Sequence, residues 1–317
     1  MTSAASTAHL APDRETGNIL LGVTGALVAV GFWAGWIVLT RLSVTTAFTP
    51  DDIVFLRFLI SAVLLLPVFW LRRRQLNYRN LPQYLFMILG AGAPYMLVAA
   101  NSMQHAPAAH VGVLMPGTMP LFVAFYGLLF FGERLGIWRY LGLGLIVLGD
   151  VAVGGFGIFH ILENDLGHAW VGYLLMLLAA AMWAGFTQAQ KRSSLDPWMA
   201  TAVVGVGSCL GFSPYYLATS GLAVFDLPWG EIALHGLYQA VASGILALAA
   251  YGIAIQHLGA QRAAAFSSLV PALGALLAIP ILGEFPDPVA WFGIGTVTLG
   301  LMLATGAIGP RARKGRG

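Results

Sequence analysis

The segment FFGERLGIWRYLGLGLIVLG, residues 130–149, decides the fold because its pattern returns near the end of the chain. There, ILGEFPDPVAWFGIGTVTLG, residues 281–300, repeats the Gly-Glu pair and the glycine spacing. In each copy, glycines follow Glu133 or Glu284 by 9, 11 and 16 residues. The first copy also carries two arginines, whereas the second has no basic residue. This difference indicates a shared fold placed in two electrically different surroundings.

The composition indicates that lipid, rather than water, surrounds most of the chain. Of its 317 residues, 58% are hydrophobic and 9% are charged, whereas a water-soluble domain carries roughly 25% charge. No basic patch with interleaved aromatic residues suggests a nucleic-acid partner. Cys209 is the one cysteine, so an internal disulfide and a cysteine-based metal site are excluded. We expect no cofactor and no metal.

Apolar segments of spanning length occur ten times, and in lipid such segments must be helices. The sequence therefore predicts an all-α integral membrane protein with two five-helix repeats. The predicted segments are 18–40, 52–71, 82–103, 107–131, 137–157, 169–190, 197–219, 232–256, 261–282 and 288–308. The predicted regions are a disordered cytoplasmic tail 1–17, a first repeat 18–157, an outer linker 158–168, a second repeat 169–308 and a basic cytoplasmic tail 309–317.

The basic residues predict how these helices are oriented, because cytoplasmic loops are enriched in Lys and Arg. With the N-terminus inside, the cytoplasmic segments hold 14 of the 16 basic residues; Arg41 lies outside and Arg57 lies within a helix. This indicates that both termini are cytoplasmic. Five helices separate the two Gly-Glu copies, so the first faces the cytoplasm and the second faces outward. The two halves are therefore expected to form an inverted-topology repeat.

Further matches support the repeat. Trp-Ala-Gly occurs at 33–35 and 183–185, and Pro120 and Pro271 each precede a Gly-Glu glutamate by 13 residues. The pair Gln-His occurs at 104–105 and at 256–257. Inverted repeats are typical of alternating-access carriers, whose substrate site lies at the repeat interface near the bilayer midplane.

Over residues 18–308 the sequence resembles an EamA-type transporter of the drug/metabolite transporter superfamily. The segments that carry this resemblance are FWAGWIVLTR, MWAGFTQAQKR, LRFLISAVLLLP, MPLFVAFYGLLFFGERL and VPALGALLAIPILGE. The second half departs from the pattern, because it has no arginine to match Arg57 and has GEFPDP in place of the usual Gly-Glu-Arg. The resemblance implies a small-molecule carrier, often an exporter of amino acids or related metabolites.

Aromatic and polar residues near the middle of the helices are candidates for binding substrate. Trp33 and Trp183 each lie eight residues from a basic residue at a helix end, which is about 12 Å of helix. Their rings either line a pocket or pack beside small residues. Pro120 and Pro271 predict matching breaks in the fourth and ninth helices. The full set of substrate-binding candidates is Trp33, Trp36, Tyr95, Asn101, Pro120, Trp183, Gln188, Tyr238, Gln239, Tyr251 and Pro271.

Arg57 and Asp150 are the clear charges within predicted helices. Their opposite signs and similar depths below the outer surface suggest an intramembrane ion pair. Three interpretations remain open: a structural pair, a proton-coupling acid at Asp150, or a site for a substrate carboxylate at Arg57.

These observations favour a transporter over an enzyme, because no metalloprotease, nucleotide-binding or nucleophile-elbow motif is present. We expect a secondary carrier that works without ATP in the cell inner (plasma) membrane. Its substrate is expected to be an amino acid or a related amphipathic metabolite, and its direction to be export. The alternative is a flippase for a lipid or lipid-linked group. The expected partners are the small-molecule substrate and the lipid bilayer, and the oligomeric state stays open.

Overall fold

The computed structural model describes residues 14–132, 135–164, 169–258, 260–306 and 308, and this part of the chain is helical without strands. Eight helical stretches are long and apolar enough to cross a membrane. The α-helices are α1 Arg14–Thr45, α2 Pro50–Arg72, α3 Leu81–Ala91, α4 Ala93–His105, α5 Ala108–Phe131, α6 Ile137–Asn164, α7 Ala169–Arg192, α8 Pro197–Thr219, α9 Trp229–Leu237, α10 Ala247–Leu258, α11 Ala260–Ser267, α12 Val270–Leu282 and α13 Pro288–Ala304.

Several of the predicted segments are not single regular helices. The third consists of α3 and α4, and the eighth consists of α9, the π-helix Tyr238–Leu246 and α10. The ninth consists of α11 and α12. Helix α1 begins at Arg14, earlier than the predicted start, while residues 1–13 and 309–317 lie outside the described residues.

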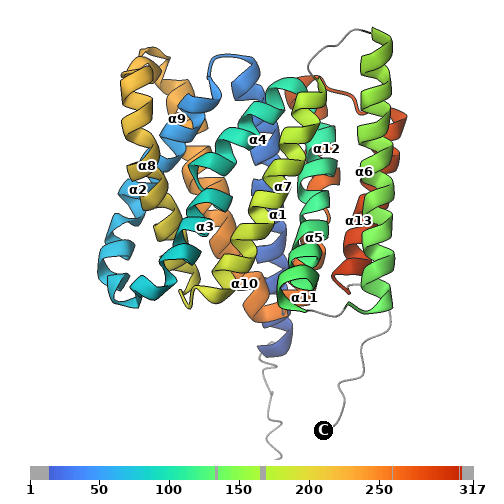
Figure 1. Ribbon diagram of the computed structural model, residues 1–317, viewed down its shortest axis with the longest axis horizontal. Helices are drawn as coiled ribbons and strands as arrows, with labels where there is room; N and C mark the ends of the chain where they lie inside the picture. The colour runs from blue at the N-terminus through green and yellow to red at the C-terminus, as the bar shows by residue number, and fades with distance from the viewer. Residues whose placement is uncertain (1–13, 133–134, 165–168, 259, 307, 309–317) are drawn as a thin grey trace, which may run out of the picture.

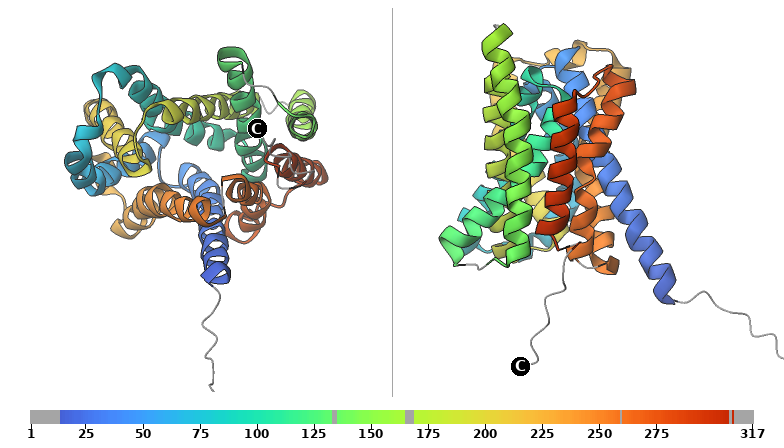
Figure 2. Two further views of the ribbon diagram at one scale, coloured as in Figure 1. Left: turned by 90° about the horizontal axis from the view of Figure 1, so that it is seen from below. Right: turned by 90° about the vertical axis from the view of Figure 1, so that its right-hand side faces the viewer.

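The helices form an elongated bundle with a helix pair at each narrow end. Helices α2 and α8 pack together at one end, and α6 and α13 pack together at the other (Figure 1). Between these pairs, α1 packs on α10 and α12, while α7 packs on α3, α4 and α5 (Figure 2, left). The two sets of contacts match, because each joins the first helix of one half to the other half.

The first helices of the two halves run in opposite directions. The C-terminal part of α1 carries Arg41, which contacts Met103 near the end of α4. Gly172 near the start of α7 lies against His105, also at the end of α4. The end of α1 and the beginning of α7 therefore lie at the same end of the bundle. Two equivalent halves enter the bundle from opposite ends.

Helices α2 and α8 show the repeat residue by residue. Each has 23 residues, begins with a proline that follows a capping side chain, and contains a second proline 17 residues later. Asn, Asp, Ser and Thr side chains cap helices by accepting from the backbone N–H groups of the first turn. Pro50 and Pro67 thus correspond to Pro197 and Pro214 at a shift of 147 residues.

The third segment of each half departs from α-helical geometry at an equivalent glycine. Gly92 separates α3 from α4 and adopts φ −94° and ψ −151°, and Gly244 lies in the π-helix. The break at Gly92 leaves the N–H of Ala93 without a partner in its own helix, and the Ser208 hydroxyl accepts from it at 3.0 Å. A Cβ on Gly92 would meet both that hydroxyl and the Ile88 carbonyl oxygen.

We therefore predict that Gly92→Ala destabilises the folded protein by about 1–3 kcal/mol, the usual cost of overpacking. The measurement is the apparent melting temperature of the purified protein in detergent. Gly211→Ala is the matched control, since a Cβ there has no neighbour within 4 Å. Equal melting temperatures for Gly92→Ala and the wild type would contradict this account of the break.

Candidate functional site

Two aromatic contacts join the halves, and their tryptophans occupy equivalent positions of the repeat. The rings of Trp33 on α1 and Tyr251 on α10 lie 5.1 Å apart. The rings of Trp183 on α7 and Tyr95 on α4 lie 5.3 Å apart. In both contacts, the tryptophan comes from the first helix of one half and the tyrosine from the third segment of the other.

These rings combine apolar surface with polar atoms. Trp33, Trp183 and Tyr251 are half-buried, whereas Tyr95 is buried and its hydroxyl lies 3.9 Å from the Met115 sulfur. Aromatic rings stack on apolar bodies and direct their N–H or O–H group to a polar partner. Together, the two contacts place aromatic rings that carry polar atoms at the interface between the halves.

Arg57 lies beside these contacts and reaches the π-helix. Its Nη1 donates to the Gln239 backbone oxygen at 2.7 Å, to the Gln239 side-chain oxygen at 3.2 Å and to the Ser243 hydroxyl at 2.9 Å. Tyr95 lies on α4, which packs against α2, and is near the guanidinium. A π-helix is rare, and where one occurs it is frequently at a functional site.

The π-helix also holds α1. Gln239 donates through Nε2 to the Thr40 hydroxyl at 2.8 Å, and the Tyr238 hydroxyl donates to the Phe32 carbonyl at 3.2 Å. Gly35 permits this approach, because a Cβ there would meet the Tyr238 hydroxyl. Two of the predicted residues, Tyr238 and Gln239, therefore join α1 and α2 to the second half.

The structure does not bring Arg57 and Asp150 together, contrary to the ion pair expected from the sequence. Asp150 Oδ2 accepts from the Thr118 hydroxyl at 3.0 Å, and its buried Oδ1 has no partner among the described residues. Helices α2 and α6 lie at opposite ends of the bundle (Figures 1 and 2). Similar depth along the helix axes does not fix lateral position, and here lateral position separates the two charges.

Three other candidates, Trp36, Asn101 and Gln188, take no part in the two aromatic contacts. Trp36 is buried, and its Nε1 has no partner among the described residues. Asn101 donates to the Leu97 carbonyl one turn earlier at 2.7 Å. Gln188 donates to the Val123 carbonyl on α5 at 3.4 Å. Of the two bonds, that of Gln188 joins α7 to α5, whereas that of Asn101 stays within α4.

The sequence predicts proline breaks in both the fourth and the ninth segment, and this prediction is wrong for the fourth segment. Helix α5 continues through Pro116 and Pro120 without interruption. The ninth segment does break, and Pro271 lies in the first turn of α12. A proline in the first turn is well tolerated, because the N–H groups there have no intrahelical acceptor. The equivalent irregularities lie instead in the third and eighth segments.

Sequence reasoning missed the hydroxyl groups that complete these sites. Ser243, Thr40 and Thr118 each bond to a predicted residue. A usable signal was present for Ser243, which follows Gln239 by four residues and so shares its helix face. Thr40 and Thr118 belong to other helices, and only the tertiary structure pairs them with Gln239 and Asp150.

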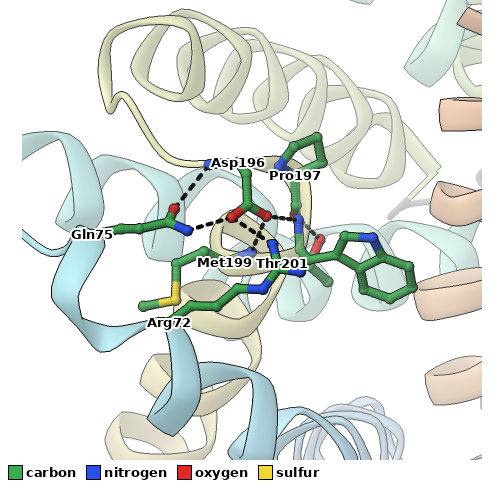
Figure 3. A network of polar contacts seen from close by, with 7 residues as sticks. Arg72, Gln75, Asp196, Pro197, Met199 and Thr201 are labelled. Carbon is green, nitrogen blue, oxygen red and sulfur yellow. Dashed lines mark hydrogen bonds and ion pairs between the residues drawn. The ribbon is translucent and has the colours of Figure 1, made fainter. Parts of the chain in front are cut away.

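Charged contacts hold the halves together at both ends of the bundle. At one end, Arg41 Nε lies 2.9 Å from Glu284 Oε1, and Glu284 Oε2 accepts from the Ala108 N–H at 2.7 Å. At the other end, Asp196 accepts from Arg72 Nη1 at 2.7 Å and from Gln75 Nε2 at 2.6 Å (Figure 3). Asp196 belongs to the second half, whereas Arg72 and Gln75 belong to the first.

The fold and these contacts define a helical membrane protein of two repeats that meet across an aromatic and polar interface. The model of the EamA-like transporter family matches residues 20–154 and again residues 170–306. The chain therefore belongs to this family of the drug/metabolite transporter superfamily, and with its eight apolar helices it is a multi-pass integral protein of the plasma membrane.

Curated relatives are similar over most of their length. An uncharacterized transporter of Bacillus subtilis, YdfC, is 24% identical over 277 residues, which is 86% of each chain. The threonine/homoserine exporter RhtA of Escherichia coli is 28% identical over 254 residues, 79% of this chain and 80% of the exporter. A solved structure described as a crystal structure of protein aligns with a TM-score of 0.59 at 19% identity, covering 92% of this chain and 97% of that one. That structural likeness shows the fold.

The Asp196 network predicts a pH-dependent contribution to stability. Partial burial acts to raise the pKa of Asp196, but hydrogen bonds from Gln75, Arg72 and the Met199 N–H lower it overall. A carboxylate with a lowered pKa stabilises the fold above its unfolded pKa of about 3.9, and this stabilisation is lost as the pH falls through the folded value. The gain is at most about 1 kcal/mol, because the pair is partly exposed.

Asp196→Asn removes this charge while keeping a side chain that caps helices well. We predict that the variant melts below the wild type at pH 7. The difference should shrink as the pH is lowered from about 5 to about 3. Melting curves over this range in one detergent provide the measurement. A gap that stays constant, or that widens in acid, would contradict the assignment.

Proposed function

We propose that the chain is a secondary carrier that exports a small amphipathic metabolite, such as an amino acid, by alternating access and without ATP. The family match supports transport as its general activity. A relative at 28% identity is named as a threonine/homoserine exporter, which supports both the substrate class and the direction. Such a chain acts by moving its substrate rather than by chemically changing it.

The observation that carries this proposal is the pair of matched aromatic contacts between the halves. Trp33 contacts Tyr251 and Trp183 contacts Tyr95, so each of the two equivalent tryptophans meets a tyrosine from the third segment of the other half. A carrier with an inverted repeat has two near-equivalent states, and its site lies where the repeats meet. Each tryptophan would face the solute from one half, and the exchange of states would expose it to either side.

The same proposal retains ten membrane segments with both termini in the cytoplasm. Helix α13 is apolar but has 17 residues, while α8 has 23 residues and packs along α2. The positive-inside tendency supports the orientation. Arg72 ends α2, and Arg73, Arg74 and Arg79 follow it, at the end of the bundle that would face the cytoplasm.

We predict that Trp33→Ala and Trp183→Ala each lower the initial rate of amino-acid counterflow in proteoliposomes by about tenfold. This corresponds to about 1.4 kcal/mol, close to the value of an aromatic contact. The assay uses labelled L-threonine, L-methionine and L-phenylalanine. Trp170→Ala is the matched control, because Trp170 lies on the same helix as Trp183 and is 49% exposed.

The control is expected to retain the wild-type rate. Loss of folded protein in both tryptophan variants would favour helix packing as their role. Translocation of labelled lipid by a wild-type protein that moves none of the three amino acids would favour a flippase and contradict the carrier proposal.

A further inference from the structure

Arg57 is a half-buried cation whose charge is not balanced by an acid in the described part of the chain. The ion pairs there are Arg41 with Glu284, Arg72 with Asp196, and His110 with Asp287. The hydrogen bonds of Arg57 go to neutral oxygens of Gln239 and Ser243. A charge among membrane helices is costly; it pairs with another charge or with backbone carbonyls, and it often marks a substrate pathway.

The guanidinium retains free donors for a further ligand. Its three hydrogen bonds all leave from Nη1, and neither Nε nor Nη2 donates to any residue that the structure describes. A guanidinium presents its N–H groups as a planar fork that matches the two oxygens of a carboxylate. Nη2 lies beside Gly244 of the π-helix, 3.7 Å from the position that a Cβ there would occupy.

The guanidinium of Arg57 lies among buried residues of other helices. Arg57 is half-buried, although its chain neighbours Leu56 and Phe58 are buried. The residues around its guanidinium are also buried, with Tyr95, Gln239 and Ser243 at most 4% exposed. The guanidinium therefore lies between α2 and buried residues of α4 and the π-helix.

The repeat itself does not account for Arg57. At the shift that aligns Pro50 with Pro197, the equivalent of Arg57 is Val204 on α8. Val204 is 8% exposed and packs in the core. The shared fold therefore works with an apolar residue at this position, and the arginine of the first half requires an additional explanation.

We propose that Arg57 binds the carboxylate of the transported molecule, with Nε and Nη2 as the donors, so that the substrate is a carboxylic acid or a zwitterion. Gln239 and Ser243 hold the guanidinium through Nη1 and leave the fork open. Tyr95 connects this anion site to Trp183, which receives the apolar part of the molecule. This inference rests on the proposed carrier function, which it deepens by naming the group that the site recognises.

The test uses matched ligands that differ in one group. The purified protein is titrated with L-threonine, L-methionine and L-phenylalanine, and with the carboxamide of each, while the melting temperature is followed. A ligand that binds the folded state raises the apparent stability with occupancy. We expect at least one amino acid to stabilise the wild type and its carboxamide to bind at least about tenfold more weakly, since the amide loses about 1.4 kcal/mol or more of charge-assisted bonding.

Variants of Arg57 test whether this residue causes the preference for the acid over the amide. Arg57→Gln should abolish the preference for the acid over the amide, and Arg57→Lys should keep part of it, because lysine retains the charge without the fork. Arg73→Gln is the control, since Arg73 is exposed and lies over the Trp70 ring. If Arg57→Gln does not fold, the ligand comparison on the wild type still decides the proposal.

The outcomes separate this inference from the function on which it rests. Equal stabilisation by acids and amides, or an unchanged preference in a folded Arg57→Gln protein, would overturn the carboxylate site. Counterflow of these or other solutes would then still support the carrier. If counterflow of every solute tested is absent while labelled lipid moves, the carrier function fails and the carboxylate site fails with it.

Discussion

A helix break within the membrane must be met by another polar group, because lipid offers the backbone no hydrogen-bond partner. This constraint acts at two equivalent places, Gly92 and the π-helix Tyr238–Leu246. Ser208 on α8 meets the first, and Arg57 on α2 meets the second. In both cases, the second helix of one half supplies the side chain that satisfies the third segment of the other half. The two halves therefore hold each other's irregular segments in place.

A comparison of these two contacts distinguishes the features that the repeat alone explains from those that need a functional explanation. A serine hydroxyl is enough to satisfy an N–H group, as Ser208 does for Ala93. At the equivalent break in the other half, a full positive charge takes part, and among the described residues no acid balances it. Symmetry explains why the breaks exist, and the departure from symmetry at Arg57 indicates where a charged ligand would be recognised. The two tryptophans, Trp33 and Trp183, follow the symmetry, while their tyrosine partners lie one helical turn apart in the aligned third segments.

The sequence was sufficient to predict the helical membrane fold and the two repeats, because apolar length and glycine spacing are local patterns. It also selected four residues, Trp33, Tyr95, Trp183 and Tyr251, that the structure brings together in two pairs. It did not predict which partner Arg57 finds, because depth along a helix leaves lateral position undetermined. Nor did it locate the π-helix, since a single glycine, Gly244, within residues 238–246 is also tolerated in an ordinary α-helix. Their geometry depends on contacts with α1 and α2.

The central claim is that the two ends of the interface open in alternation. Electron paramagnetic resonance distances between spin labels test it directly in a Cys209→Ser background. One pair of labels, at positions 222 and 285, reports the end held by Arg41 and Glu284; a second pair, at 78 and 137, reports the opposite end. Glu284→Gln removes the ion pair and should lengthen the first distance while shortening the second. Distances that change independently, or a second distance that does not respond, would contradict alternating access.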